Sequence, residues 1–202
     1  MRSKKFIAVY ILLFTIAIFL SLKFDDWVIQ AVSNIRTPIL TQILIGITFT
    51  SSEIVIFFFL TSLFLFNEGK RKWIFPLWLT LFFSVILSFI LKFAIQRLRP
   101  FQQDLVSIPE MLASKSYDIW NFSFPSFQAM LVFCALPIIS KEFPKIKWFW
   151  IVFAILVAFS RVYFGLHFLS DVLVGGILGY LIGVLVIKLE KKKKLIKRIF
   201  GR

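Results

Sequence analysis

Long apolar segments dominate this chain, and they limit it to structures that a lipid bilayer permits. Of its 202 residues, 59% are hydrophobic. About 20 consecutive apolar residues suffice to cross the hydrocarbon core as a helix. Such segments can be drawn at 6–22, 48–66, 73–95, 125–140, 148–165 and 170–189, the fourth extended by residues 120–124. The sequence therefore predicts an all-α polytopic membrane protein, a six-transmembrane helical bundle forming a single domain over residues 1–202.

The basic residues predict the orientation of this bundle. With the N-terminus in the cytoplasm, 17 of the 24 lysines and arginines fall in inner segments, at 1–5, 67–72, 141–147 and 188–202. Cytoplasmic loops carry such an excess. We therefore expect a multi-pass protein of the plasma membrane with both termini in the cytoplasm. The net charge of +14 then reflects topology, and the basic tail contacts anionic lipid, so no nucleic acid is expected as a partner.

Three apolar segments carry features with simple structural interpretations. The first follows Arg2 and two lysines, as a signal peptide would, but no small-residue cleavage site comes after it, so a retained helix is preferred. Cys134 is the only cysteine, which excludes an intramolecular disulfide and favours a buried hydrophobic role. Gly175, Gly179 and Gly183 repeat at a spacing typical of close helix packing. Packing within the bundle is the preferred interpretation of this pattern, dimerisation is the alternative, and the oligomeric state stays open.

The outer segments carry further expectations. In Phe24–Pro38, apolar residues recur at helical spacing, which predicts a short helix lying in the membrane interface. Gln96–Phe124 is the longest loop, and loops of this length often form lids or binding elements. Arg97 within it is interpreted as a solvated loop residue or a contact to a lipid headgroup. Glu53, near the outer end of the second segment, is interpreted as a hydrogen-bonded packing residue.

Ionisable residues gather at the outer face in the predicted topology. His167, the only histidine, lies in the pattern Ser160-Arg161-(five residues)-His167-(three residues)-Asp171. Ionisable groups at membrane depth are costly and usually mark functional sites. The sequence therefore predicts a site where the fifth and sixth apolar segments meet.

Two other segments reach the same face. Lys92 and Arg99 are seven residues apart, which places them on one face if the third helix continues to Arg99. Pro100 would then end that helix. Pro125-Ser126 opens the fourth apolar segment, in the position of a helix start.

Together these residue types suit phosphoryl chemistry. Lys92, Arg99 and Arg161 would supply positive charges for phosphate oxygens. The start of the fourth helix would offer free backbone N–H groups. His167 could attack phosphorus to form a phosphohistidine, while Asp171 holds the ring tautomer. The sequence shows no carboxylate cluster that favours a divalent metal, so no metal or cofactor is expected.

Each of these residues also has a structural interpretation when it is taken alone. Lys92 or Arg99 could snorkel from the end of a helix. Arg161 and Asp171 could form an ion pair, and His167 could be a hydrogen-bonded core residue. Their occurrence together on one side of the membrane favours a common site.

The pattern resembles the type-2 phosphatidic acid phosphatase superfamily of integral membrane lipid phosphatases. That superfamily carries the motifs Lys-(six)-Arg-Pro, Pro-Ser-Gly-His and Ser-Arg-(five)-His-(three)-Asp. Lys92–Pro100 matches the first and Ser160–Asp171 the third. The second reads Pro125-Ser126-Phe127-Gln128, so Phe127 replaces the glycine and Gln128 the histidine. The resemblance spans the chain and implies six transmembrane helices with an active site facing the extracytoplasmic side.

The resemblance implies an enzyme that hydrolyses a lipid phosphate or diphosphate. His167 would be the nucleophile, Asp171 its orienting partner, and Gln128 would stand where the family has its general acid. The phosphate-binding residues implied are Lys92, Arg99, Ser126, Phe127, Ser160 and Arg161. Glutamine cannot deliver a proton, and phenylalanine lacks the access to positive φ that glycine has. Loss of the acid favours a diphosphate of a polyprenyl lipid, whose leaving group needs less protonation, over phosphatidylglycerophosphate or phosphatidate.

Two other functions stay open. The altered second motif fits a lipid-phosphate binding or sensing protein with weakened hydrolysis. The same fold could also serve as the scaffold of a transporter or an assembly component. The complete His167–Asp171 pair favours the enzyme, because a protein that only binds phosphate would not require it.

Overall fold

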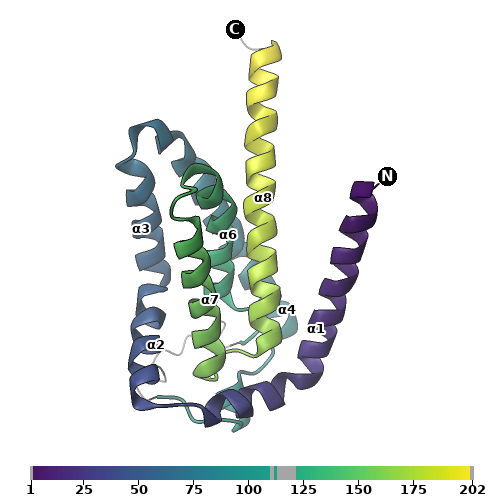
Figure 1. The fold of residues 1–202 in the computed structure, drawn as a ribbon, viewed down its shortest axis with the longest axis vertical. Helices are drawn as coiled ribbons and strands as arrows, with labels where there is room; N and C mark the ends of the chain where they lie inside the picture. Colours follow the sequence, from purple (N-terminus) through teal and green to yellow (C-terminus); the bar gives the residue numbers. More distant parts are fainter. Residues whose placement is uncertain (1, 110–111, 113–121, 201–202) are drawn as a thin grey trace.

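The helices of this protein run side by side as an elongated bundle (Figure 1). The structure is a computed structural model that describes residues 2–109, 112 and 122–200. Its helices are α1 (Arg2–Asn34), α2 (Pro38–Thr50), α3 (Glu53–Leu65), η1 (Glu68–Trp73), α4 (Ile74–Ile95), η2 (Pro100–Gln103), α6 (Phe127–Glu142), α7 (Lys147–Tyr163) and α8 (Leu169–Phe200). These described residues contain no strand, which confirms the all-α prediction. Residues 110–111 and 113–121 of the outer loop, which include the first two residues predicted to extend the fourth segment, lie outside the described part.

Two described helical stretches are long and apolar enough to cross a bilayer alone, Glu68–Gln103 and Leu169–Lys192. The pair α2 and α3 is a third candidate, bent by 65°. α6, with 16 residues, is shorter than a typical span. The count of six transmembrane helices therefore stays a prediction.

The bend between α2 and α3 corrects the predicted second segment at 48–66. The helix crossing that region starts at Glu53, and residues 48–50 belong to α2, which begins at Pro38. The reason is a run of hydroxyl side chains, which compete with the helix for backbone hydrogen bonds. Ser51 Oγ donates to Thr48 O at 2.9 Å, and Ser52 is extended. A window that averages hydropathy does not register such a break.

The predicted interfacial helix at 24–38 is continuous with α1 rather than separate from it. α1 runs to Asn34, and its last turns cross the lower end of the bundle in Figure 1. Both ends of the chain lie at the opposite end of the bundle in this view. The α7–α8 connection and the start of α6 therefore share one end with the last turns of α1.

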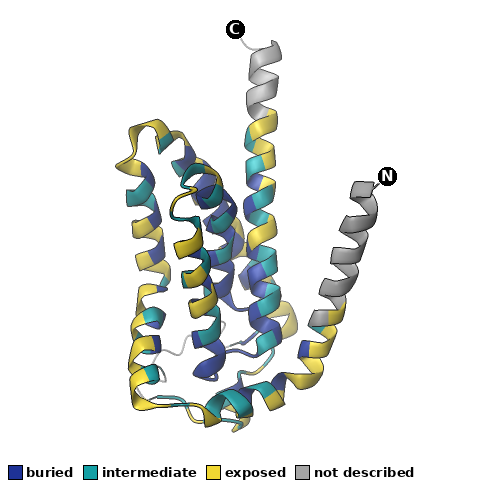
Figure 2. Cartoon of the chain, in the orientation of Figure 1, coloured by how far each residue is buried: buried dark blue, intermediate teal, exposed yellow. Residues whose placement is uncertain are grey.

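The surface of the bundle is apolar along much of its length. Buried positions concentrate on α6 and on the faces of its neighbours that meet it, while exposed positions follow the outer faces (Figure 2). Large hydrophobic side chains are exposed there, among them Phe58 at 62%, Phe75 at 63% and Phe149 at 69%. Apolar surface of this extent is unusual in a soluble monomer and fits contact with lipid.

α6 and α8 pack with their backbones in contact. A Cβ atom added to Gly175, Gly179 or Gly183 would overlap a main-chain oxygen of α6, at Ser126, Met130 or Cys134 respectively. This confirms the prediction that the glycines serve packing within the bundle. Cys134, whose main-chain oxygen lies beside Gly183, has a buried side chain, as predicted. The close approach holds the first turn of α8 beside the first turn of α6.

Candidate active site

The end of α4 differs from its prediction. The helix closes at Gln96, whose φ of 50° is left-handed and whose N–H donates to Lys92 O at 2.9 Å. Residues 97–99 then lie outside any helix, and Pro100 begins η2. The prediction that Lys92 and Arg99 share one helical face, with Pro100 ending that helix, was therefore wrong. The two cations come from different elements of the fold.

His167 lies in the short connection between α7 and α8 and is 1% exposed. Its Nδ1 atom is 2.7 Å from the main-chain oxygen of Ser123. A carbonyl oxygen only accepts, so Nδ1 carries the hydrogen and Nε2 keeps its lone pair. Asp171 Oδ2 is 3.8 Å from Nδ1, too far for a hydrogen bond. The tautomer-setting bond predicted for Asp171 is therefore made by Ser123.

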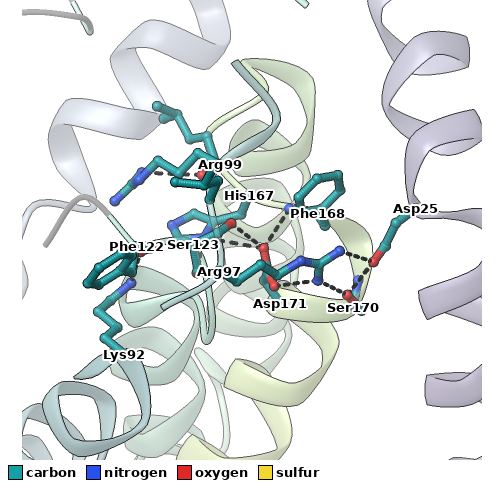
Figure 3. A network of polar contacts seen from close by, with 12 residues as sticks. Asp25, Lys92, Arg97, Arg99, Phe122, Ser123, His167, Phe168, Ser170 and Asp171 are labelled. Carbon is teal, nitrogen blue, oxygen red and sulfur yellow. Dashed lines mark hydrogen bonds and ion pairs between the residues drawn. The ribbon is translucent and has the colours of Figure 1, made fainter. Parts of the chain in front are cut away.

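Asp171 lies behind the imidazole in the first turn of α8 and is fully buried (Figure 3). Its Oδ2 accepts from Ser123 Oγ and, at 2.8 Å, from Phe168 N. Its Oδ1 accepts from Arg97 Nη1 at 2.9 Å. Ser123 thus contacts His167 through its main chain and Asp171 through its side chain.

Arg97 is the basic partner of Asp171, and its interpretation as a solvated loop residue was wrong. Its Nη2 is 2.8 Å from Asp25 Oδ2, and its Nη1 donates to Ser170 Oγ at 2.7 Å. The guanidinium also lies 3.8 Å from the ring centroid of Phe168. Asp25 is 72 residues from Arg97 in the chain, so no local spacing in the sequence links them. The Arg161–Asp171 ion pair considered from the sequence does not form, because Arg97 occupies that place.

Two of the three predicted phosphate-binding cations, Lys92 and Arg99, lie near the imidazole, and the third, Arg161, lies near Arg99. Arg99 and Lys92 both act electrostatically on His167, and Arg99 on Arg161. Lys92 is 1% exposed and donates to the main-chain oxygen of Phe122. Arg99 Nη1 donates to Leu166 O at 3.2 Å. The fold therefore brings these three residues together from α4, the outer loop and α7.

Arg161 is held at the bend between α2 and α3. Its Nη2 donates to Ser51 Oγ at 3.3 Å and to Thr48 O at 3.5 Å, while its Nε is buried without a partner. Ser160, also predicted to bind phosphate, directs its hydroxyl elsewhere. It donates to Val157 O at 2.8 Å and accepts from Thr48 Oγ1 at 3.3 Å. Ser160 thus joins α7 to α2.

Burial sets the protonation state of the imidazole. Removal from water lowers the pKa of His167 to about 3. Asp171 raises this pKa, whereas the charges of Arg99 and Lys92 lower it further. The ring is therefore neutral at neutral pH, which is the form with a nucleophilic nitrogen.

The altered second motif forms the start of α6, as predicted. Ser126 is the N-cap residue, and its N–H donates to Asp171 O at 3.0 Å. Its hydroxyl is buried, has no partner and does not cap the helix. Phe127 is the first helical residue, and its side chain is buried in the core. Its φ is not positive, so the expected disturbance from losing glycine does not arise, and its main chain alone is available to a ligand.

Gln128 is partly exposed at the same helix start. Its Nε2 donates to Glu53 Oε1 at 3.5 Å, the long end of the hydrogen-bond range. Glu53 is exposed and also acts electrostatically on Arg161. Glu53 is therefore hydrogen-bonded, as interpreted from the sequence, but it is exposed rather than packed, and its carboxylate lies beside the second motif.

Comparison with known proteins identifies the family. The sequence model of the PAP2 superfamily matches residues 73–195. Phosphatidylglycerophosphatase B of Bacillus subtilis is 32% identical over 186 residues, covering 84% of this chain and 85% of that protein. An undecaprenyl-diphosphatase of Sulfolobus acidocaldarius is 32% identical over 133 residues, 64% of this chain and 61% of that relative. The crystal structure of a transmembrane PAP2-type phosphatidylglycerolphosphate phosphatase from Bacillus subtilis has a TM-score of 0.71 at 27% identity, covering 95% of this chain and 98% of that chain. The chain therefore belongs to the PAP2 superfamily.

Proposed function

We propose that this protein is a membrane phosphatase that hydrolyses a lipid phosphate or diphosphate through a phosphohistidine at His167. The observation that carries this proposal is the buried neutral imidazole, whose Nδ1 is hydrogen-bonded to Ser123 O at 2.7 Å. Lys92 and Arg99 lie near the ring, and Arg161 lies near Arg99. The relatives named above are a phosphatidylglycerophosphatase and an undecaprenyl-diphosphatase, which supports a lipid phosphate or diphosphate as the substrate of this protein.

The first step transfers the phosphoryl group to the enzyme. His167 Nε2 attacks phosphorus with its lone pair, the bond from phosphorus to the leaving-group oxygen breaks, and that oxygen keeps the electron pair. The phosphorylated ring then carries positive charge, because Nδ1 retains its hydrogen. The nearby carboxylate of Asp171 stabilises this charge.

The second step regenerates the enzyme. Water attacks phosphorus, the N–P bond breaks, and its electrons return to Nε2. The hydrogens of the water stay on the phosphate, which leaves as dihydrogen phosphate. Gln128 is placed to orient this water: with its amide nitrogen donating to Glu53, its carbonyl oxygen remains able to accept a hydrogen from water.

The phosphate oxygens would be bound by the cations and by the start of α6. Arg99 and Arg161 offer N–H groups in the planar arrangement that suits phosphate. The buried hydroxyl of Ser126, which has no partner in the fold, is a further ligand. The first main-chain N–H groups of α6, at Phe127 and after it, lack partners within the helix. Ser160, whose hydroxyl is engaged with Val157, supports the site through packing.

The missing general acid supports a diphosphate as the preferred substrate. A phosphomonoester expels an alkoxide, a strong base that requires a proton, and general acid catalysis contributes roughly 10²–10⁴-fold. A polyprenyl diphosphate expels a phosphate anion instead. With glutamine at position 128, turnover of the monophosphate should be lowered more than turnover of the diphosphate, unless another residue supplies the proton. The ratio of diphosphate to monophosphate turnover therefore measures the effect of Gln128.

We place the protein in the plasma membrane, with both termini in the cytoplasm and the site facing outward. The chain ends and the α7–α8 connection lie at opposite ends of the bundle in Figure 1, which supports their placement on opposite sides of the membrane. The basic tail after Lys188 supports a cytoplasmic location of the chain ends. Cysteine labelling of intact cells at Asp104→Cys, in a Cys134→Ala background, tests it. Labelling by a membrane-impermeant maleimide is expected, and labelling only after lysis would refute this orientation.

A panel of lipid monophosphates and diphosphates in detergent tests the function. We expect phosphate release by the wild type, no release by H167A, and acid-labile phosphate on the wild-type protein during a single turnover. Tight binding of a lipid phosphate with neither release nor labelling would favour the alternative, a binding or sensing protein. The observation that favours this second function is the glutamine at position 128, where the family has a histidine.

A further inference from the structure

We propose that Asp25 and Arg97 are positioning residues that preserve the negative charge of Asp171 for the imidazole. This role rests on the proposed function of His167 as nucleophile. Asp25 lies outside the motifs that carry the family resemblance, and Arg97 occupies an unspecified position within the first of them. Figure 3 draws no hydrogen bond or ion pair from either residue to the imidazole.

Arg97 lies between two carboxylates. Its Nη1 is 2.9 Å from Asp171 Oδ1, and its Nη2 is 2.8 Å from Asp25 Oδ2. The guanidinium also stacks near Phe168, which restricts its movement. The ends of the arginine fork are thus divided between a residue of α8 and a residue of α1.

Burial strengthens the electrostatic interactions among Asp25, Asp171 and Arg97. Asp25 is 1% exposed and Asp171 is fully buried, whereas the Arg97 side chain is 22% exposed. Interactions between charges are much stronger in such an environment than in water. Each carboxylate therefore depends on Arg97 and on nearby N–H and O–H donors for compensation.

The three side chains carry one net negative charge. Arg97 paired with Asp171 alone would cancel the charge that faces the ring. Asp25 neutralises Arg97, so the cluster as a whole stays negative behind His167. This charge is needed when Nε2 carries the phosphoryl group, because the ring is then cationic and 3.8 Å separates its Nδ1 from Asp171 Oδ2.

Asp25 also fixes the backbone that carries Asp171. Its Oδ1 accepts from Ser170 N at 3.0 Å, and its Oδ2 accepts from Ser170 Oγ at 2.5 Å. Ser170 precedes Asp171 in the first turn of α8. A carboxylate from α1 thereby satisfies a main-chain N–H at the start of another helix, where its negative charge is also favoured.

The experiment is a double-mutant cycle on the full-length protein in detergent, with D25N, R97Q and D25N/R97Q. D26N is the matched control, because Asp26 is the neighbouring acid and is exposed. We expect D25N to lower kcat at least about tenfold with KM within about twofold of wild type, since an unpaired Arg97 then offsets Asp171. D26N should retain wild-type kcat.

The double variant separates charge from simple packing. In D25N/R97Q, Asp171 again carries the single net negative charge, so its kcat should exceed that of D25N. R97Q alone leaves two buried carboxylates without their cation, so it should be the slowest and should melt below the double variant. A role in packing alone predicts that the double variant is at least as impaired as the worse single variant.

Two results would overturn the proposal: a kcat for D25N equal to that of D26N, or a kcat for D25N/R97Q no higher than that of D25N. The D25N against D26N comparison stands even if variants at Arg97 fail to fold. Formation of phosphohistidine in a single turnover is measured for each variant. If the wild type forms none and H167A is equally active, the proposed function fails, whereas failure of the cycle alone leaves that function in place.

Discussion

The Nδ1 atom of His167 donates to the main-chain oxygen of Ser123 across 2.7 Å, and this bond selects the ring tautomer. The same serine donates its hydroxyl to Asp171, and its N–H donates to Arg97 O at 2.7 Å. Ser123 is fully buried. The histidine and the aspartate of the third motif are therefore joined through a residue just ahead of the second motif.

Replacing Ser123 by alanine should lower kcat about tenfold. The main-chain bond to His167 persists, so the tautomer is kept, but Asp171 loses a donor, and a hydrogen bond to a charged group contributes about 1.5–3 kcal/mol. Phosphate release from a lipid diphosphate measures the effect. S88A is the control, because Ser88 is also buried yet its hydroxyl has no partner. A wild-type kcat in S123A would show that Asp171 does not depend on this serine.

The sequence predicted the residues whose positions follow from local spacing. Arg161, His167 and Asp171 share one motif across a helix end, and the start of α6 is indicated by Pro125. Topology alone placed these segments at one face of the bundle. Contacts between segments remote in sequence were not predicted. The tie between Asp25 and Arg97 depends on how α1 crosses the end of the bundle, and no periodicity encodes that.

Local backbone conformation was the other source of error. Hydropathy placed a single segment over 48–66, whereas Ser51 and Ser52 divide it. Proline spacing suggested that α4 reaches Arg99, whereas Gln96 adopts a left-handed conformation and ends it. In both cases the backbone of one or two residues decided a helix boundary within an apolar stretch. In the first the hydroxyl of Ser51 competes for a backbone oxygen, and in the second Gln96 is left-handed.

The low pKa of His167 predicts a specific pH dependence of stability. The native pKa is about 3, and an unfolded histidine titrates near 6.5. Between these values the unfolded state binds the extra proton, so the free energy of unfolding falls as pH drops from about 6.5 towards 3. Thermal unfolding in detergent should therefore show wild-type Tm falling more than that of H167N between pH 7.5 and 5. Parallel Tm curves for the two proteins would contradict a buried neutral imidazole.

Restoring the family's histidine should change substrate preference. Q128H would supply an acid beside Glu53 at the start of α6, and its benefit should be larger for leaving groups that need a proton. We expect turnover of a lipid monophosphate to rise at least about tenfold while turnover of the matched diphosphate changes less. Q128N, which keeps the amide but shortens it, is the control. An equal gain on both substrates, or faster monophosphate turnover by the wild type, would refute the diphosphate preference.

An apolar hollow of about 510 Å³ lies between the α2–α3 bend and α7. Its lining includes Ile47 and Thr50, which are close in sequence to the two residues that contact Arg161. The hollow therefore lies beside the bend that holds Arg161, and its walls are largely apolar residues of α2, α3 and the first turns of α7. We predict that it receives the hydrocarbon tail of the substrate.

Gly46 allows this prediction to be tested without disturbing the fold. It lines the hollow, and a Cβ atom there would meet nothing within 4 Å, so G46F should fold while filling the space. Displacing about two methylenes of a tail, at about 0.8 kcal/mol each, corresponds to about a tenfold rise in KM. That rise should occur for a long-chain substrate and not for a short-chain analogue, and kcat on the analogue should be unchanged.

G69F is the matched control, since a Cβ at Gly69 also meets nothing within 4 Å but the residue lies in η1, outside the hollow. Equal KM changes for long and short chains in G46F would mean that the tail lies elsewhere.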